Sequence, residues 1–144
     1  SAALAAVLLI GPRLGKYNEF GVPQPIHGSN AAQVTLGTLI LWFGWFGFNG
    51  GSQLSIIGIE NANAVAKIFV NTNTAAAAGL LSAMIISKVW LGKTALNAVC
   101  NGALAGLVVI TADPLTPSPY MAIVYGALVG LLVLLLRQQT FLTV

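Results

Sequence analysis

The 144-residue chain is 57% hydrophobic and only 6% charged, whereas an ordinary soluble domain has about 25% charged residues. So few polar side chains cannot cover a globule in water, and the composition favours a helix bundle in lipid. The net charge of +3 comes from six basic and three acidic residues, which are too sparse for the clustered basic surface that binds nucleic acid.

The N-terminal stretch SAALAAVLLIGPRLGK places an apolar run before its positive charges. A secretory signal peptide has the opposite order. At roughly ten residues the run is too short to cross a bilayer, which takes about 20. We therefore expect residues 1–11 to be the second half of a membrane helix, and the chain to be a piece of a longer polypeptide.

Four longer apolar segments follow, each close to the length that crosses about 30 Å of hydrocarbon as a helix. Lipid offers no partner to free backbone groups, and the alternating pattern of a β-barrel is missing from the sequence, so helices are required. The predicted transmembrane helices are residues 31–49, 62–87, 95–112 and 120–136. The fold class is accordingly an all-α, polytopic transmembrane helix bundle, an integral multi-pass protein of a lipid bilayer.

Charge placement predicts the orientation of these helices. Basic residues lie on alternate connections and at the C-terminal end, namely Arg13, Lys16, Lys88, Lys93 and Arg137, whereas the other two connections carry Glu60 and Asp113. The positive-inside rule puts the basic side in the cytoplasm, so FNGGS and DPLTPSP face outward. Lys67 stands about one turn into the second segment. We expect it to reach the interface or to pair with Glu60, and a functional role is the alternative.

Small residues indicate tight helix packing. The third and fourth segments contain GALAGLVVI from Gly102 and GALVGLLVL from Gly126, and each has a Gly-x-x-x-Gly step that lets helix backbones approach in lipid. Shared packing chemistry explains this likeness more simply than a sequence repeat. The second segment has small residues from Ala75 to Gly79, and Cys100 is expected to be a small buried side chain.

Polar residues within the segments are few. They are Asn71, Thr72, Asn73 and Thr74 in the second segment, and Asn101 and Thr111 in the third. Hydrogen bonding between helices is the favoured role, and pore lining by one or two of them remains open. No segment has an ionisable side chain at its centre, so either whatever crosses is neutral at the midplane or nothing crosses.

The sequence offers nothing for an enzyme. His27 is the only histidine and is predicted in a loop near a helix N-cap at Ser29 or Asn30. One loop histidine builds neither a metal site nor a catalytic base. There is no Ser/His/Asp constellation, no cysteine cluster and no phosphate-binding glycine loop. We predict no catalytic residues, no metal and no cofactor.

The stretch LWFGWFGFNGGS, residues 41–52, combines glycines with aromatics. On a helix Gly44 and Gly47 leave a shallow groove, and four aromatic residues flank it: Trp42, Trp45, Phe46 and Phe48. Phe48 and Ser52 fall at the outward end. An aromatic face with a hydroxyl can attract and partly desolvate a small cation such as ammonium. An interfacial aromatic belt is an equally good explanation from these residues alone.

Three strings in the sequence resemble the ammonium transporter (Amt/Rh) family. They are LGTLILWFGWFGFNGGS (Leu36 to Ser52), which is similar to the family's signature, FVNTNTAAAAG (Phe69 to Gly79) and CNGALAGLVVITA (Cys100 to Ala112). The family forms homotrimers of eleven-helix subunits built from inverted repeats, each with its own apolar pore. The resemblance implies that this chain runs from the end of the fifth helix through the ninth, in the cell membrane.

The resemblance also implies roles for four residues. Phe48 falls at a pore-blocking phenylalanine, Ser52 at a hydroxyl of an external ammonium site and Trp45 at a pore-lining tryptophan. Thr111 falls at a threonine beside the pore. The family's two pore histidines would lie just before Ser1 and beyond Val144, and His27 matches only a loop position.

Moving a charged ammonium ion into hydrocarbon costs several kcal/mol even after relaxation. The resemblance implies that ammonium is caught outside and loses its proton, that neutral ammonia crosses, and that the proton follows separately through the family's paired histidines. Ammonium transport by a homotrimer is thus the expected function. The rival is a non-transporting ammonium sensor or a structural membrane subunit of the same family.

Overall fold

The fold was obtained as a computed structural model, which describes residues 2–24, 26 and 30–142; His27 and Ser29 lie outside these residues. The helices in the described part are α1 (Ala2–Ile10), α2 (Ala31–Gly51), α3 (Ile59–Leu91), α4 (Leu96–Ile110) and α5 (Pro119–Leu142). The predicted all-α class is confirmed. The chain divides into two units, α1 with its following loop and α2 to α5.

The smaller unit consists of α1 and a polar turn. Gly11, with φ 73°, follows the end of α1 in the left-handed region that glycine tolerates. The Asn18 side-chain oxygen accepts from the backbone N–H groups of Phe20 and Val22, at 3.0 and 2.8 Å. The backbone N–H of Gln24 donates to the Lys16 carbonyl oxygen at 2.6 Å. These bonds close the loop on itself.

Local chemistry sets the helix ends in the larger unit. The Asn30 side chain caps α2 by accepting from the N–H groups of Ala32 and Gln33, one of the two capping positions expected. Gly92 ends α3 with φ 69° in the left-handed conformation common after a helix. Pro119 begins α5, where its missing N–H has no partner to lose.

Helix lengths suit a bilayer to different degrees. Within the described residues, three stretches are long and apolar enough to cross a membrane: Ala31–Gly51, Ile59–Trp90 and Pro119–Leu136. The 15 residues of α4 extend only about 22 Å, and Thr111 and Ala112 of the predicted segment 95–112 follow the helix. Which turns lie within lipid stays a prediction. Lys67 and Lys88 stand about 32 Å apart along α3, close to the hydrocarbon thickness.

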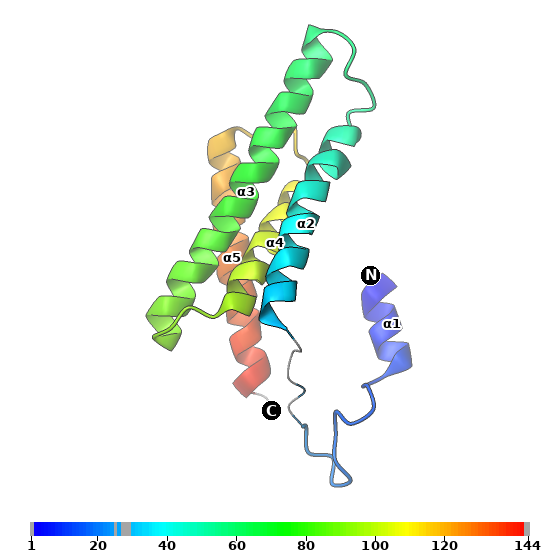
Figure 1. The fold of residues 1–144 in the computed structure, drawn as a ribbon, viewed down its shortest axis with the longest axis vertical. Helices are drawn as coiled ribbons and strands as arrows, with labels where there is room; N and C mark the ends of the chain where they lie inside the picture. Colours follow the sequence, from blue (N-terminus) through cyan, green and yellow to red (C-terminus); the bar gives the residue numbers. More distant parts are fainter. Residues whose placement is uncertain (1, 25, 27–29, 143–144) are drawn as a thin grey trace. The chain divides into compact units, whose positions relative to one another are not determined.

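The centre of the larger unit is α3, against which α2, α4 and α5 pack (Figure 1). A Cβ atom added at Gly106 or at Gly126 would collide with the backbone of Ala75, and one at Gly79 with the backbone of Gly102. Two small clusters fill the interior: Ala75, Ile110 and Ala122, and Ala83, Ala98 and Leu134. The close backbone approach expected from the Gly-x-x-x-Gly steps is confirmed.

Alanine at two glycines separates packing from helix propensity. We expect Gly126→Ala to lower the free energy of unfolding by about 1–3 kcal/mol, because the added methyl group would push α5 away from the Ala75 carbonyl. Gly37 has open space around it, so Gly37→Ala is expected to be neutral or to stabilise α2 by up to about 1 kcal/mol. Thermal unfolding in detergent measures both, and equal melting temperatures would contradict the packing described.

Candidate functional site

The aromatic and glycine residues of α2 fall on two opposite faces. Spacings of three and four residues place one set together, here called the site face: Leu41, Gly44, Trp45, Phe48 and Ser52. The packing face carries Phe43, Phe46, Gly47 and Gly50. The Phe46 ring meets the Phe69 ring of α3 edge-on, with centroids 5.4 Å apart, and a Cβ at Gly50 would collide with that ring. The contact between α2 and α3 therefore depends on both the Phe46 ring and the missing side chain of Gly50.

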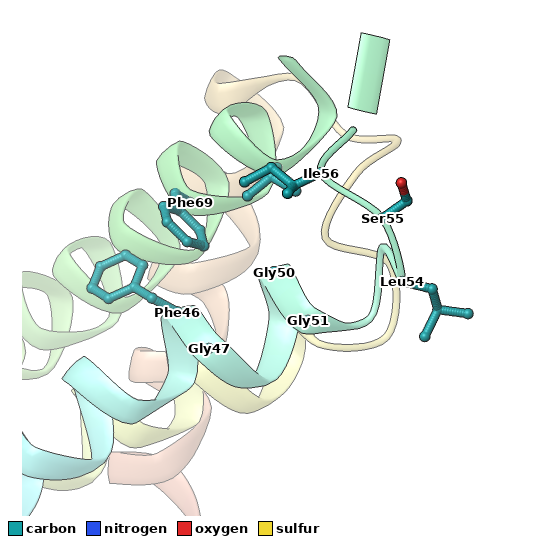
Figure 2. Close-up of a pocket in the computed structure, with 9 residues that line it drawn as sticks. Phe46, Gly47, Gly50, Gly51, Leu54, Ser55, Ile56 and Phe69 are labelled. Carbon is teal, nitrogen blue, oxygen red and sulfur yellow. The ribbon is translucent and has the colours of Figure 1, made fainter. Parts of the chain in front are cut away.

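An open hollow lies beside the packing face, between the end of α2 and α3. Figure 2 shows the Phe46 and Phe69 rings at this hollow, the glycines of α2 along one side, and Leu54 pointing away from the helices. Its lining includes Gly47, Gly50 and Ile56. None of the four residues predicted for the site lines it, so the candidate site lies on the other face of α2.

Trp45 and Thr111 are joined by a hydrogen bond. The indole Nε1 donates to the Thr111 Oγ1 at 2.7 Å, and the Thr111 hydroxyl donates its own proton to the Leu107 carbonyl oxygen at 2.8 Å. The bond links α2 to the residue that caps α4. Two predicted site residues from distant parts of the sequence are thus brought together, and the Trp45 ring is fixed in orientation.

Phe48 continues the aromatic wall. Its ring centroid lies 5.9 Å from that of Trp45, with the planes tilted by 57°. With Ile40, Leu41 and Gly44 the two rings line an open hollow of about 430 Å³. Trp45 is half-buried, whereas Phe48 is 63% exposed. The site face therefore presents an apolar hollow with two aromatic walls.

Ser52 caps the C-terminal end of α2, one turn beyond Phe48. Its hydroxyl donates to the Phe48 carbonyl oxygen at 3.0 Å. With the proton used in this way, the Ser52 oxygen keeps lone pairs that can only accept. An exposed acceptor next to an aromatic ring suits a cation that carries N–H groups.

Two buried residues, Asn49 and Thr72, form a second hydrogen bond between α2 and another helix. Asn49 Nδ2 donates to Thr72 Oγ1 at 3.0 Å, and the Thr72 hydroxyl donates to the Ile68 carbonyl oxygen at 2.7 Å. The favoured role of Thr72, hydrogen bonding between helices, is confirmed. In the sequence Asn49 is the last residue of the predicted segment 31–49, and its place directly after an aromatic run is the signal that could have indicated a polar contact.

The loop between α4 and α5 has its own polar contacts. Asp113 accepts from the Thr116 backbone N–H at 3.0 Å, and Lys67 Nζ donates to the Thr116 carbonyl oxygen at 3.4 Å. Lys67 thus bonds this loop in place of the expected Glu60. The backbone N–H and hydroxyl of Thr116, with the Lys67 ammonium, hold the pKa of Asp113 below its ordinary value. The loop is anchored beside the third turn of α3.

The cysteine is placed as expected. Cys100 is buried, with its sulfur 3.9 Å from the Thr35 hydroxyl oxygen. In the described part of the chain, no group of three or more His, Cys, Asp and Glu side chains is placed to hold a metal ion.

A double-mutant cycle measures the bond between α2 and α4. Trp45→Phe removes the donor together with part of the ring, and Thr111→Val removes the acceptor with little change of shape. We expect each to lower the free energy of unfolding, and the pair to show a coupling of about 1 kcal/mol. Thermal unfolding of the four proteins in detergent gives the coupling, and strictly additive effects would contradict a bond in the folded protein.

Acid stability tests the Asp113 contact. Since the pKa of Asp113 is lowered in the folded state, its contribution is present above the unfolded pKa of about 3.9 and is lost as pH falls through the lower folded value. Asp113→Asn is expected to remove this part of the acid dependence. Melting temperature between pH 6 and pH 3 is the measurement, with Glu19→Gln in the smaller unit as the control. Identical acid profiles for the original protein and Asp113→Asn would count against the contact.

Comparison with known proteins identifies the family of the chain. The family described as "Ammonium Transporter Family" matches residues 1–141. Ammonium transporter Amt2 of Archaeoglobus fulgidus is 51% identical over 128 residues, 89% of this chain and 26% of its own length. Ammonium transporter 1 member 3 of Solanum lycopersicum is 37% identical over 139 residues, 88% of this chain and 30% of its own length.

Solved structures show the same fold. A protein titled "Sensor Amt Protein" aligns with a TM-score of 0.78 and 39% identity over 90% of this chain and 31% of its own. Candida albicans Mep2 aligns with a TM-score of 0.70 and 33% identity over 90% of this chain and 28% of its own. The chain thus spans less than a third of the length of these relatives. It belongs to the ammonium transporter family, a family of multi-pass membrane transporters and not of enzymes.

Proposed function

We propose that the protein carrying this chain transports ammonium across a membrane, and that the site face of α2 forms part of its path. The observation that carries the proposal is the bond between Trp45 and Thr111, which holds an aromatic wall beside an apolar hollow. Phe48 and Ser52 extend the same face to the end of the helix. Family membership supports ammonium as the substrate.

Capture is assigned to Ser52 and Phe48. Ammonium carries four N–H donors and a positive charge. The Ser52 oxygen can accept one of these donors because its own proton is bound to the Phe48 carbonyl. The exposed Phe48 ring can attract the charge with its π face. Together they form a weak external site that selects a small cation with N–H groups.

Passage is assigned to the hollow beside Trp45. Its lining is Ile40, Leu41, Gly44, Trp45 and Phe48, and none of these carries a titratable group that could balance a charge. Moving the charged ion there would cost several kcal/mol. Neutral ammonia is therefore the species proposed to cross, and the route of the proton is assigned to no residue of this chain.

The assembly belongs to the same proposal. By resemblance, the complete subunit has eleven helices in inverted repeats and forms a homotrimer in the cell membrane. The basic ends of the helices would face the cytoplasm, and the α2–α3 and α4–α5 loops would face outward.

An ammonium sensor is the second candidate. The observation that favours it is the likeness to the structure titled "Sensor Amt Protein", at 39% identity over 90% of this chain. A sensor would keep the capture residues Phe48 and Ser52 and respond to the bound cation, with little or no flux. A transporter and a sensor would therefore both bind ammonium at Phe48 and Ser52, and only the transporter would let ammonia pass.

Uptake of labelled methylammonium by cells that lack their own transporters, expressing the complete polypeptide, tests the proposal. We expect saturable uptake, with Ser52→Ala raising the half-saturating concentration because the hydroxyl acceptor is lost. Phe48→Ala is expected to change uptake at low concentration through loss of the aromatic face. Both should leave the thermal stability of the bundle nearly unchanged.

Phe43→Ala is the matched control, because Phe43 is an exposed phenylalanine on the opposite face of α2. If neither Ser52→Ala nor Phe48→Ala changes the uptake kinetics at low ammonium, the assignment of these residues to the external site is wrong. Absence of uptake by a correctly inserted protein that still binds ammonium would favour the sensor.

A further inference from the structure

The α4–α5 loop has backbone acceptors that the loop itself does not supply with donors. Pro114 and Pro117 lie within it and Pro119 follows, and proline has no N–H to give. The Thr116 N–H is already bound to the Asp113 carboxylate. Partly buried carbonyl groups also need partners, and Pro114 and Pro117 are partly buried. Their carbonyl oxygens accept donors from another element.

α3 supplies these donors from one stripe. Asn71 Nδ2 donates to the carbonyl oxygens of Pro114 and Pro117, both at 2.9 Å. Lys67, four residues earlier on the same face, donates to the Thr116 carbonyl oxygen at 3.4 Å. Asn71 is fully buried, whereas Lys67 is exposed. The Asn71 amide is therefore the stronger anchor of the loop.

The unpaired side-chain oxygen of Asn71 shows that the α4–α5 loop requires hydrogen-bond donors. Asn71 Oδ1 is buried and has no hydrogen-bond partner among the described residues. Rotating the amide by half a turn would place this oxygen against two carbonyl oxygens and repel them. The loop therefore needs the two N–H groups of Asn71, and an acceptor of the same shape cannot replace them.

We infer that Asn71 is a positioning residue for the path beside α2. Pro114 comes three residues after Thr111, whose hydroxyl accepts the Trp45 indole N–H. By holding Pro114 and Pro117, Asn71 sets where the chain leaves α4, and so the place of the Thr111 hydroxyl and the angle of the Trp45 ring. The inference rests on the proposed function insofar as Trp45 lines the route of ammonia.

The first test follows the Trp45 ring itself. In the complete polypeptide with Trp42→Phe, Trp90→Phe and any further tryptophan replaced, Trp45 is the single fluorophore. Asn71→Asp keeps the shape and replaces two donors with acceptors. We expect it to shift the Trp45 emission in the same direction as Thr111→Val. Asn63→Asp, the same chemical change at an exposed position of α3, is expected to leave the emission unchanged.

A milder variant covers the case in which Asn71→Asp does not fold. Asn71→Ser keeps one donor at the cost of volume, and its expected emission shift is smaller but of the same sign. An emission spectrum unchanged in every folded Asn71 variant, with Thr111→Val shifted, would overturn the inference.

The second test asks whether Asn71 acts through Thr111. Asn71→Asp is expected to lower the maximal rate of methylammonium uptake severalfold at an unchanged half-saturating concentration, the opposite split from Ser52→Ala. Added to Thr111→Val, it should cause little further loss, because both substitutions release the same ring. Losses that multiply would mean independent, merely structural effects and would overturn the inference.

The two tests separate this inference from the proposed function. If the protein transports no ammonium and Asn71→Asp still shifts the Trp45 emission, the positioning of Trp45 by Asn71 stands and transport is rejected. If the protein transports ammonium and Asn71→Asp leaves the Trp45 emission unchanged, transport stands and the positioning role is rejected.

Discussion

α4 and α5 touch α3 at the level of the backbone, and both make this contact at Ala75. Gly106 and Gly126 face the same stretch of α3, and neither has room for a Cβ atom. In lipid the hydrophobic effect gives little drive for helices to associate, so close van der Waals packing of this kind must hold them. Thr111 follows Gly106 by little more than one turn. The glycine contact therefore fixes the height and rotation of the residue that receives the Trp45 indole.

α2 is attached by side chains instead of by backbone contact. Trp45 bonds Thr111 of α4, Asn49 bonds Thr72 of α3, and Phe46 meets Phe69. This difference explains why LWFGWFGFNGGS contains both glycines and aromatics. Gly50 gives way to the Phe69 ring, whereas Gly44 and Gly47 have open space around them and shape the hollows on either face. α2 thus contacts α3 through Phe46 and Gly50 and α4 through Trp45, and it leaves Phe48 of the site face exposed.

Sequence patterns predicted the all-α class and close helix packing through small residues, because both depend on local periodicity and residue size. They did not predict that Trp45 would donate to Thr111, since a helical period gives the face of each helix and not which faces come together. Of the two positions expected for Lys67, the pairing with Glu60 is replaced by a bond to the Thr116 carbonyl oxygen, and its place at the membrane interface stays a prediction. The apolar segment 62–87 is shorter than α3, Ile59–Leu91, because backbone hydrogen bonds continue into polar turns that hydropathy excludes.

Three hydroxyl groups, one each from α3 and the C-caps of α2 and α4, make the same kind of hydrogen bond. Ser52, Thr72 and Thr111 each donate to the carbonyl oxygen four residues earlier, which leaves every one of these oxygens as an acceptor. Thr72 receives the Asn49 amide and Thr111 receives the Trp45 indole. Ser52 receives no donor from the described part of the chain. An N–H donor from outside would complete the series, and ammonium is the donor that the proposed function brings to that oxygen, beside the exposed ring of Phe48.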